Sequence, residues 1–136
     1  MKTSGFDHIN LTVSNLARSR RFYGDLLGFE LHITPDDYPD SLAAGSFSFF
    51  VGSVEVAVIT HPTTSPEDRF DETRIGLDHL SFKAPNEQAL YDLAGILQEA
   101  GVETNGVEEY TPNGKKYVAF RDPDNIQLEY WLDSRE

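Results

Sequence analysis

The feature of this sequence that most restricts its fold is a short pattern that occurs twice. Residues 6–13 read FDHINLTV and residues 77–84 read LDHLSFKA, so each copy places Asp-His at the start of an alternating apolar and polar run. A period of two predicts a β-strand with one buried face. Each copy is followed by a segment with helical periodicity, a glycine and further strand-like runs. We therefore expect two similar modules, each with the order strand, helix and three strands.

The two predicted modules cover about residues 5–61 and 77–133. The segment between them, about 62–76, contains two prolines and several charges and is the best candidate for a linker. A unit of this size does not bury its sheet alone, whereas two copies can share one domain over residues 1–136. The predicted fold class is α+β, with paired βαβββ modules that form a curved, cup-shaped mixed sheet and helices on the outside.

Local signals set the limits of the predicted elements. Helices begin at Ser14 or Asn15 and at Pro85-Asn86, and they end near Gly28 and Gly101. In the first helix the apolar face consists of Leu16, Tyr23, Leu26 and Leu27, with Phe22 at its edge. Strands are predicted over 29–33, 46–51, 54–60, 102–107 (weakly), 117–121 and 126–132, with a hairpin turn at 52–53 and a hairpin loop over 108–116.

Composition and charge exclude several classes of partner. The formal net charge is −12, so a nucleic-acid backbone would be repelled. No apolar run is long enough to cross a bilayer, and the chain opens with no signal-peptide pattern. The absence of cysteine excludes disulfides and thiolate metal ligands. We expect a cytoplasmic protein with a small-molecule substrate, no nucleic acid and no membrane.

Two histidines and one glutamate are the candidate metal ligands. His8 and His79 occupy matching positions in the repeat, and Glu129 lies in the last predicted strand. By alternation, all three side chains point away from the apolar face of their strands. Two imidazoles and a carboxylate on rigid strands are a common open site for a divalent cation.

These features together resemble the vicinal oxygen chelate superfamily, which includes glyoxalase I, extradiol dioxygenases, fosfomycin-resistance thiol transferases and bleomycin-resistance proteins. The resemblance rests on the paired modules, the Asp-His strand starts and the ending Asp122-Pro-Asp-Asn with Glu129. It implies a metal-dependent enzyme, glyoxalase-like or dioxygenase-like, acting on a small molecule that chelates the metal through adjacent oxygens. It also implies a homodimer and a divalent ion (Fe²⁺, Mn²⁺, Zn²⁺ or Ni²⁺) held by His8, His79 and Glu129.

The resemblance leaves a fourth ligand position open. That position lies on the last strand of the first module, where Glu55 and Ala57 both have the required parity. If Glu55 is the ligand, the set resembles that of glyoxalase I. If Ala57 occupies the position, three protein ligands remain, as in extradiol dioxygenases.

Catalytic roles are expected for four residues. Glu129 or Glu55 would shuttle a proton in a lyase or isomerase, because a metal-bound carboxylate near a substrate carbon can act as a base. The extradiol comparison implies an acid–base role for His61 and a role in the site for Tyr117.

The alternative hypothesis is a metal-free, acidic small-molecule-binding protein of the bleomycin-resistance type. Its negative charge would attract a cationic aromatic ligand, on which aromatic side chains would stack. The candidates for this stacking are Phe47, Phe49, Tyr110, Tyr117 and Trp131.

Overall fold

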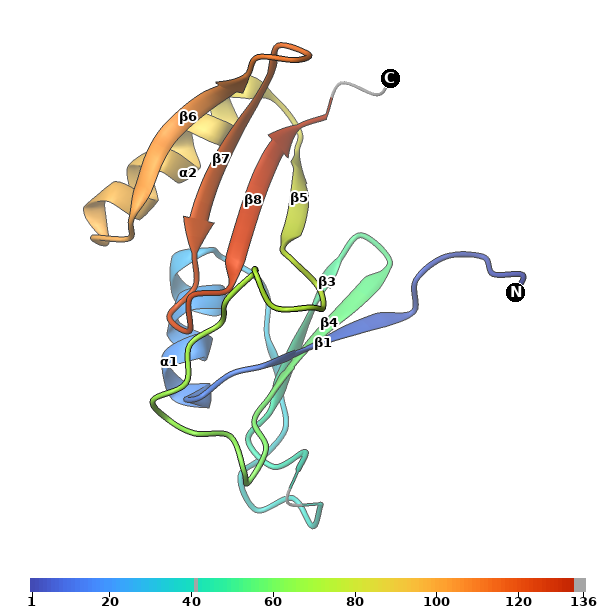
Figure 1. Cartoon of the computed structure of the whole chain (residues 1–136). Helices are drawn as coiled ribbons and strands as arrows, with labels where there is room; N and C mark the ends of the chain where they lie inside the picture. Colours follow the sequence, from blue (N-terminus) through green and yellow to red (C-terminus); the bar gives the residue numbers. More distant parts are fainter. Residues whose placement is uncertain (41, 134–136) are drawn as a thin grey trace. The chain divides into compact units, whose positions relative to one another are not determined.

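The computed structural model describes residues 1–40 and 42–133. The chain forms two compact units, Met1–Asp68 and Arg69–Glu136, each built around one four-stranded sheet (Figure 1). Within the described residues, no helix combines the length and the apolar character that a membrane crossing requires.

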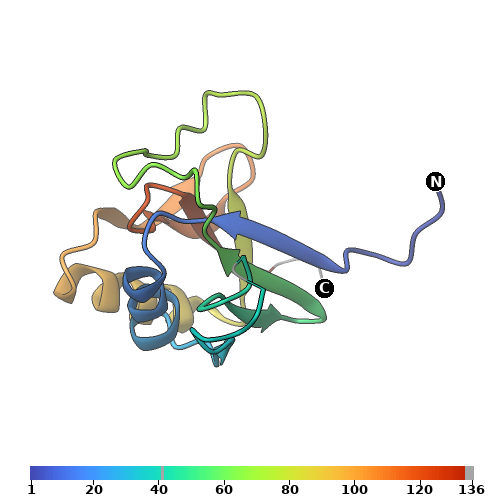
Figure 2. The ribbon, with the colours of Figure 1, turned by 90° about the horizontal axis from the view of Figure 1, so that it is seen from below.

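The first unit contains a mixed sheet with strand order β1-β4-β3-β2. β1 runs parallel to β4, and the other pairs are antiparallel. Seen from below in Figure 2, β1 lies along the edge of this sheet beside β4. The elements are β1 (His8–Thr12), α1 (Leu16–Arg20), the π-helix η1 (Arg21–Leu26), β2 (His32–Ile33), β3 (Phe47–Val51) and β4 (Val54–Ile59).

The second unit repeats this topology with strand order β5-β8-β7-β6, in which β5 is parallel to β8. Its helix begins after Asn86, whose side chain caps the backbone N–H of Ala89, as predicted from the sequence. The elements are β5 (Leu80–Ala84), α2 (Glu87–Glu99), β6 (Thr104–Tyr110), β7 (Lys115–Arg121) and β8 (Gln127–Leu132). The α+β class and the paired βαβββ modules are confirmed, and each sheet is curved.

Each unit buries one face of its sheet. In the second unit Val118, Phe120 and Leu128 are buried on the face toward the apolar stripe of α2, where Leu90 and Leu97 are fully buried. In the first unit Phe47, Phe49, Val56 and Val58 are buried with Phe22 and Tyr23 of η1. Strand alternation therefore leaves the opposite face of each sheet free for polar side chains.

The first helix differs from its prediction. It changes from α to π geometry at Arg21. Tyr23 of the predicted apolar face and Phe22 at its edge are buried, as is Ser19, whereas the three leucines of that face are only half-buried. The wider π turn lets two adjacent rings reach the core, where Phe22 packs edge-on against Tyr23 and Tyr23 stacks on Phe49. Gly24 permits close packing here, because a Cβ at this position would lie 2.8 Å from Leu31 Cδ1.

Two strand predictions were also wrong in extent. β2 contains only His32 and Ile33, because the Phe29 N–H donates to the Tyr23 carbonyl and the Phe29 ring stacks on Phe49. The predicted loop over 108–116 is largely strand, since β6 continues to Tyr110 and β7 begins at Lys115. The polar residues that indicated a loop there occupy an extended two-stranded ribbon.

The second half of the predicted linker is bound to the second unit. The Phe70 N–H donates to the Asp124 carbonyl, and Asn125 Nδ2 donates to the Phe70 carbonyl, both at 2.9 Å. The Arg121 guanidinium donates to both carboxylate oxygens of Glu72 at 2.7 and 2.9 Å. Residues 69–76 thus belong structurally to the module that follows them.

The turn between β7 and β8 depends on Asp122, which is 5% exposed. Its Oδ1 accepts hydrogen bonds from the N–H groups of Asp124 and Ile126, each at 2.8 Å. Asn125 adopts φ 71°, a conformation that asparagine tolerates better than most residues. This turn sets the residue at which β8 begins and thereby fixes the position of Glu129 within that strand.

We expect Asp122→Ala to destabilise the protein by about 3 kcal/mol, because it leaves two buried N–H donors without their charged acceptor. Urea unfolding measures this change. Asp25→Ala, at an exposed carboxylate in η1, is the control and is expected to shift stability by less than about 0.5 kcal/mol. Equal effects of the two substitutions would contradict the role given to Asp122.

The Glu72–Arg121 pair predicts a pH dependence of stability. The hydrogen bonds from Arg121 lower the pKa of Glu72 from 4.5 to about 2. A depressed folded-state pKa stabilises the protein above the unfolded value, and this contribution disappears as the pH falls from 4.5 towards 2. Glu72→Gln should therefore lower the melting temperature at pH 7 and have progressively less effect below pH 4.5. Glu99→Gln, on the exposed end of α2, is the control for a loss of charge alone.

Candidate functional site

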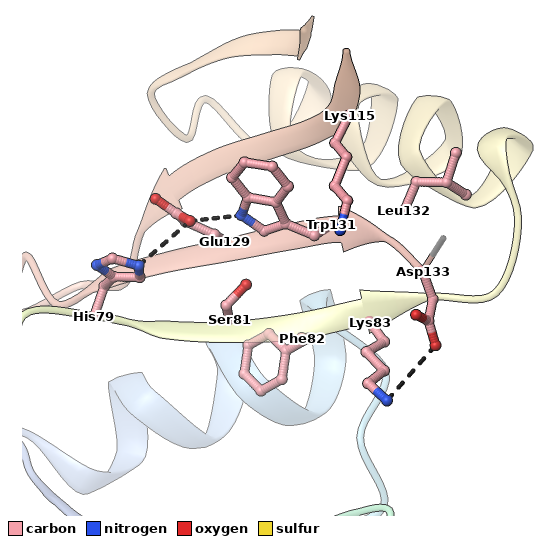
Figure 3. A pocket seen from close by; sticks show the side chains of 9 residues that line it. All are labelled: His79, Ser81, Phe82, Lys83, Lys115, Glu129, Trp131, Leu132 and Asp133. Atoms are coloured by element: carbon pink, nitrogen blue, oxygen red, sulfur yellow. Dashed lines mark hydrogen bonds and ion pairs between the residues drawn. The ribbon is translucent and has the colours of Figure 1, made fainter. Parts of the chain in front are cut away.

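His79 and Glu129 meet on the polar face of the second sheet (Figure 3). The parallel pairing of β5 and β8 places Ser81 opposite Glu129, and His79 immediately precedes β5. The His79 Nε2 atom lies 3.4 Å from Glu129 Oε2. The structure thus brings together two of the three residues predicted as metal ligands, although they are far apart in the sequence.

The orientation of the His79 ring is set by its neighbour in sequence. Nδ1 lies 2.6 Å from Asp78 Oδ1 and donates to it, because an ionised carboxylate can only accept. In a neutral imidazole this leaves Nε2 as a lone-pair acceptor directed towards Glu129. The Asp-His pair of the repeated motif is therefore an orienting device, a role that its spacing in the sequence did not reveal.

Glu129 is held by hydrogen bonds to both of its carboxylate oxygens. Trp131 Nε1 donates to Oε2 at 2.6 Å, and Gln127 Nε2 donates to Oε1 at 3.0 Å. The Glu129 side chain is only 13% exposed. These contacts fix the carboxylate while each oxygen keeps a further lone pair for another partner.

The indole of Trp131 is itself fixed by aromatic neighbours. It stacks on Tyr117 with ring centroids 4.5 Å apart and an interplanar angle of 13°, and it meets Tyr110 edge-on at 5.8 Å. Burial, followed by the negative charges of Glu108 and Glu129, raises the pKa of Tyr117 above its ordinary value of 10.0. Tyr117 is therefore a neutral phenol at physiological pH and supports the indole.

In the first unit, His8 repeats the arrangement of His79. Its Nδ1 lies 2.7 Å from Asp7 Oδ1, and its side chain is 56% exposed. Glu55 lies directly opposite His8 in the β1–β4 ladder, while His61 follows β4 and is exposed. Across residues 1–40 and 42–133, no three His, Cys, Asp or Glu side chains are grouped as a metal site.

The two sheets can be compared through their strand registers. The residue two places after each motif histidine is Asn10 in β1 and Ser81 in β5, and their ladder partners are Ala57 and Glu129. The antiparallel neighbours agree, because Ser48 pairs with Ala57 where Ala119 pairs with Glu129. By register, Ala57 is therefore the counterpart of Glu129 in the repeat.

A pocket of about 430 Å³ opens on the same face of the second sheet. Two of its lining residues, Lys83 and Lys115, were not predicted as site residues, although Lys83 shares strand parity with His79 and Lys115 shares it with Tyr117. Figure 3 shows both lysines at the end of the pocket away from His79. The lining consists of His79, Ser81, Phe82, Lys83, Lys115, Glu129, Trp131, Leu132 and Asp133.

Comparison with known proteins agrees with this fold and topology. The sequence model of the Glyoxalase/Bleomycin resistance protein/Dioxygenase superfamily matches residues 5–130. The chain belongs to this superfamily, whose members typically use a divalent metal ion and bind small-molecule substrates. The family resemblance predicted from the sequence is confirmed.

Individual relatives cover almost the whole chain. A glyoxylase/bleomycin resistance protein/dioxygenase domain from Frankia sp. EAN1pec is 31% identical, with a TM-score of 0.82 over 98% of this chain and 95% of that one. The uncharacterized protein YwkD of Bacillus subtilis is 26% identical over 96% of this chain and 98% of its own length. A lactoylglutathione lyase from Agrobacterium tumefaciens, 18% identical with a TM-score of 0.69 over 97% and 96% of the two chains, shares the fold.

We expect Tyr117 to ionise above pH 10, because burial and two nearby carboxylates oppose the phenolate. The difference between the ultraviolet titration curves of the wild type and Tyr117→Phe isolates this residue. Tyr91→Phe, which removes a half-exposed tyrosine of α2, supplies the reference titration. A Tyr117 midpoint at or below 10 in folded protein would contradict the packing described here.

Proposed function

We propose that this protein is a metal-dependent enzyme that acts on a small molecule with two adjacent metal-chelating oxygens. The observation that carries this proposal is the approach of His79 Nε2 to Glu129 Oε2 at 3.4 Å. With the Nδ1 proton directed at Asp78, both facing atoms are acceptors. Two acceptors so close together require a proton or a cation between them.

The residues present fit a divalent ion. Bonds of about 2.1 Å from imidazole nitrogen and carboxylate oxygen are typical of such ions, and two of them can bridge this separation. The carboxylate–histidine contact behind His79 and the indole N–H behind Glu129 are outer contacts of the kind that support metal ligands.

We propose His8 as the third ligand, because Asp7 orients it as Asp78 orients His79. The register comparison favours a site with three protein ligands, since alanine stands where a fourth carboxylate would be expected. Glu55 then serves as a neighbouring carboxylate that pairs in the ladder with His8. It remains a candidate proton carrier but not our preferred ligand.

A bound divalent ion would supply Lewis-acid stabilisation of charge developing on substrate oxygens. The contributions of the chain are to bind, orient and move a proton. Glu129 Oε1 accepts a hydrogen bond from Gln127 and keeps a second lone pair, whereas Oε2 is engaged by the indole and also faces His79. Oε1 would therefore be the oxygen that accepts a substrate proton. The indole of Trp131, stacked on Tyr117, donates to this carboxylate and keeps it in position.

A lyase or isomerase reaction agrees best with this carboxylate. In the dioxygenase version His61 would be the acid–base group, yet the contact found for it is a backbone hydrogen bond with Thr64. The metal-free binding protein remains the competing hypothesis, and the paired acceptors of His79 and Glu129 argue against it.

The proposal predicts a specific pattern of metal content. Wild-type protein purified without a histidine tag should hold about one divalent ion per chain after reconstitution, and His8→Ala, His79→Ala and Glu129→Ala should each hold less than about a tenth of that amount. Mass spectrometry of the metal, with folding checked by circular dichroism, makes the measurement.

Two variants serve as controls. Glu55→Ala tests the fourth position and should retain the metal, whereas its loss would establish a four-ligand site. His32→Ala removes an exposed histidine of β2 and should have no effect. If the wild type takes up no metal at all, the enzyme proposal fails and the metal-free binding protein becomes the better account.

A further inference from the structure

The pocket in the second unit has different chemistry at its two ends. His79 and Glu129 lie at one end, while Lys83 and Lys115 lie at the other (Figure 3). The proposed metal-dependent function uses only the first end. The lysines lie on two different strands, β5 and β7, that flank β8.

Strand geometry gives the separation of the two ends. Lys83 follows His79 by four residues along β5, and Lys115 precedes Ala119, the ladder partner of Glu129, by four residues along β7. Four residues of extended chain span about 13 Å, and lysine side chains can lean over several ångströms of that length. Trp131 follows Glu129 by two residues on β8 and pairs with Lys83 on one side and with Tyr117 on the other, so it is level with Lys83 and lies between Glu129 and Lys115.

The two ammonium groups are not equivalent. Lys83 Nζ is 3.6 Å from Asp133 Oδ2 and is therefore partly neutralised. Among the described residues, Lys115 Nζ has no carboxylate partner within ion-pair distance, although its side chain is only partly exposed. The adjacent Lys116 points to the other face of β7 and pairs with Glu87 of α2. Within the described part of the chain, Lys115 is thus a cation directed into the pocket without an ion-pair partner.

An unpaired ammonium in a pocket of a strongly acidic chain selects against cations and favours one anionic group. We propose that the substrate is a small organic acid with its chelating oxygens at the His79–Glu129 end and its carboxylate on Lys115. The apolar middle of the molecule would lie along the indole of Trp131. This assignment rests on the proposed function and adds the class of substrate to it.

The test uses hydroxamates as chelating probes, because each presents two adjacent oxygens. Monohydroxamates of succinic, pimelic and sebacic acid vary the distance to the carboxylate, and the matching primary amides and terminal amines vary the charge. Binding to Mn²⁺-loaded and metal-free protein is followed by the fluorescence of Trp131, the single tryptophan of the chain. Metal uptake is measured separately, so failure of the metal site and failure of the anion site give different results.

We expect the pimelic acid probe to bind at least about tenfold more tightly than its amide, because a charge-assisted hydrogen bond is lost in the amide. The succinic probe should show little preference, since it is too short to reach Lys115. Lys115→Met should lower the affinity for the pimelic acid probe to that of its amide, without changing metal uptake. Lys116→Met, one residue away on the opposite face, is the matched control and should retain the full preference.

Three results would overturn the assignment while metal uptake is normal: equal binding of acid and amide, preference for the terminal amine, or retention of acid preference in Lys115→Met. If metal uptake fails, the comparison of acid, amide and amine in the metal-free protein still decides whether Lys115 selects an anion. Preference for the amine in the metal-free protein would overturn the assignment and support the metal-free binding protein with a cationic ligand.

Discussion

The parallel pairing of the first and last strands within each module is the constraint on which the site depends. A parallel neighbour cannot be reached by a tight turn, so the chain must pass through a helix and two further strands before it returns. In the second unit this return places β8 beside β5 and brings Glu129 to His79. The helix that makes the crossover also covers the apolar face of the sheet. The same connection therefore builds the core on one face and the site on the other.

The polar face has its own internal order. A continuous set of contacts runs from Asp78 through His79 and Glu129 to Trp131, and then by stacking to Tyr117. Every member has its orientation set by the next, so the carboxylate and the imidazole are held before any ligand arrives. Preorganisation of this kind reduces the free energy that a site must spend on ordering its own side chains. The turn at Asp122 contributes from a distance, because it fixes the start of β8.

Much of this arrangement could be predicted from the sequence, and for identifiable reasons. The repeated Asp-His motif, the Asn86 cap and the alternation in β8 are local signals with one dominant structural meaning. The π-helix could not be predicted from local signals. It depends on which side chains pack in the core, and here Phe22 and Tyr23 are buried while the neighbouring leucines are only half-buried. Residues 108–116 were predicted as a loop because they are polar. The cross-strand pairs that stabilise β6 against β7, such as Glu109 with Lys116, can be recognised only when the strand register is known. Likewise, counting from a turn could not choose between Glu55 and Ala57, whereas the ladder registers of the two sheets could be compared directly.

The separation of an apolar face from a polar face in each sheet has a consequence for how such a protein changes over generations. Side chains on the polar face do not pack against the helix, so substitutions there leave the packed core intact. The two modules already differ in this way, since alanine stands at position 57 where the other module has glutamate, while the strand order is the same. Side chains of other charge and length can replace Lys83 and Lys115 at their end of the pocket in the same way. Because the core and the site lie on opposite faces of the sheet, a protein of this fold can change its substrate while its core packing stays the same.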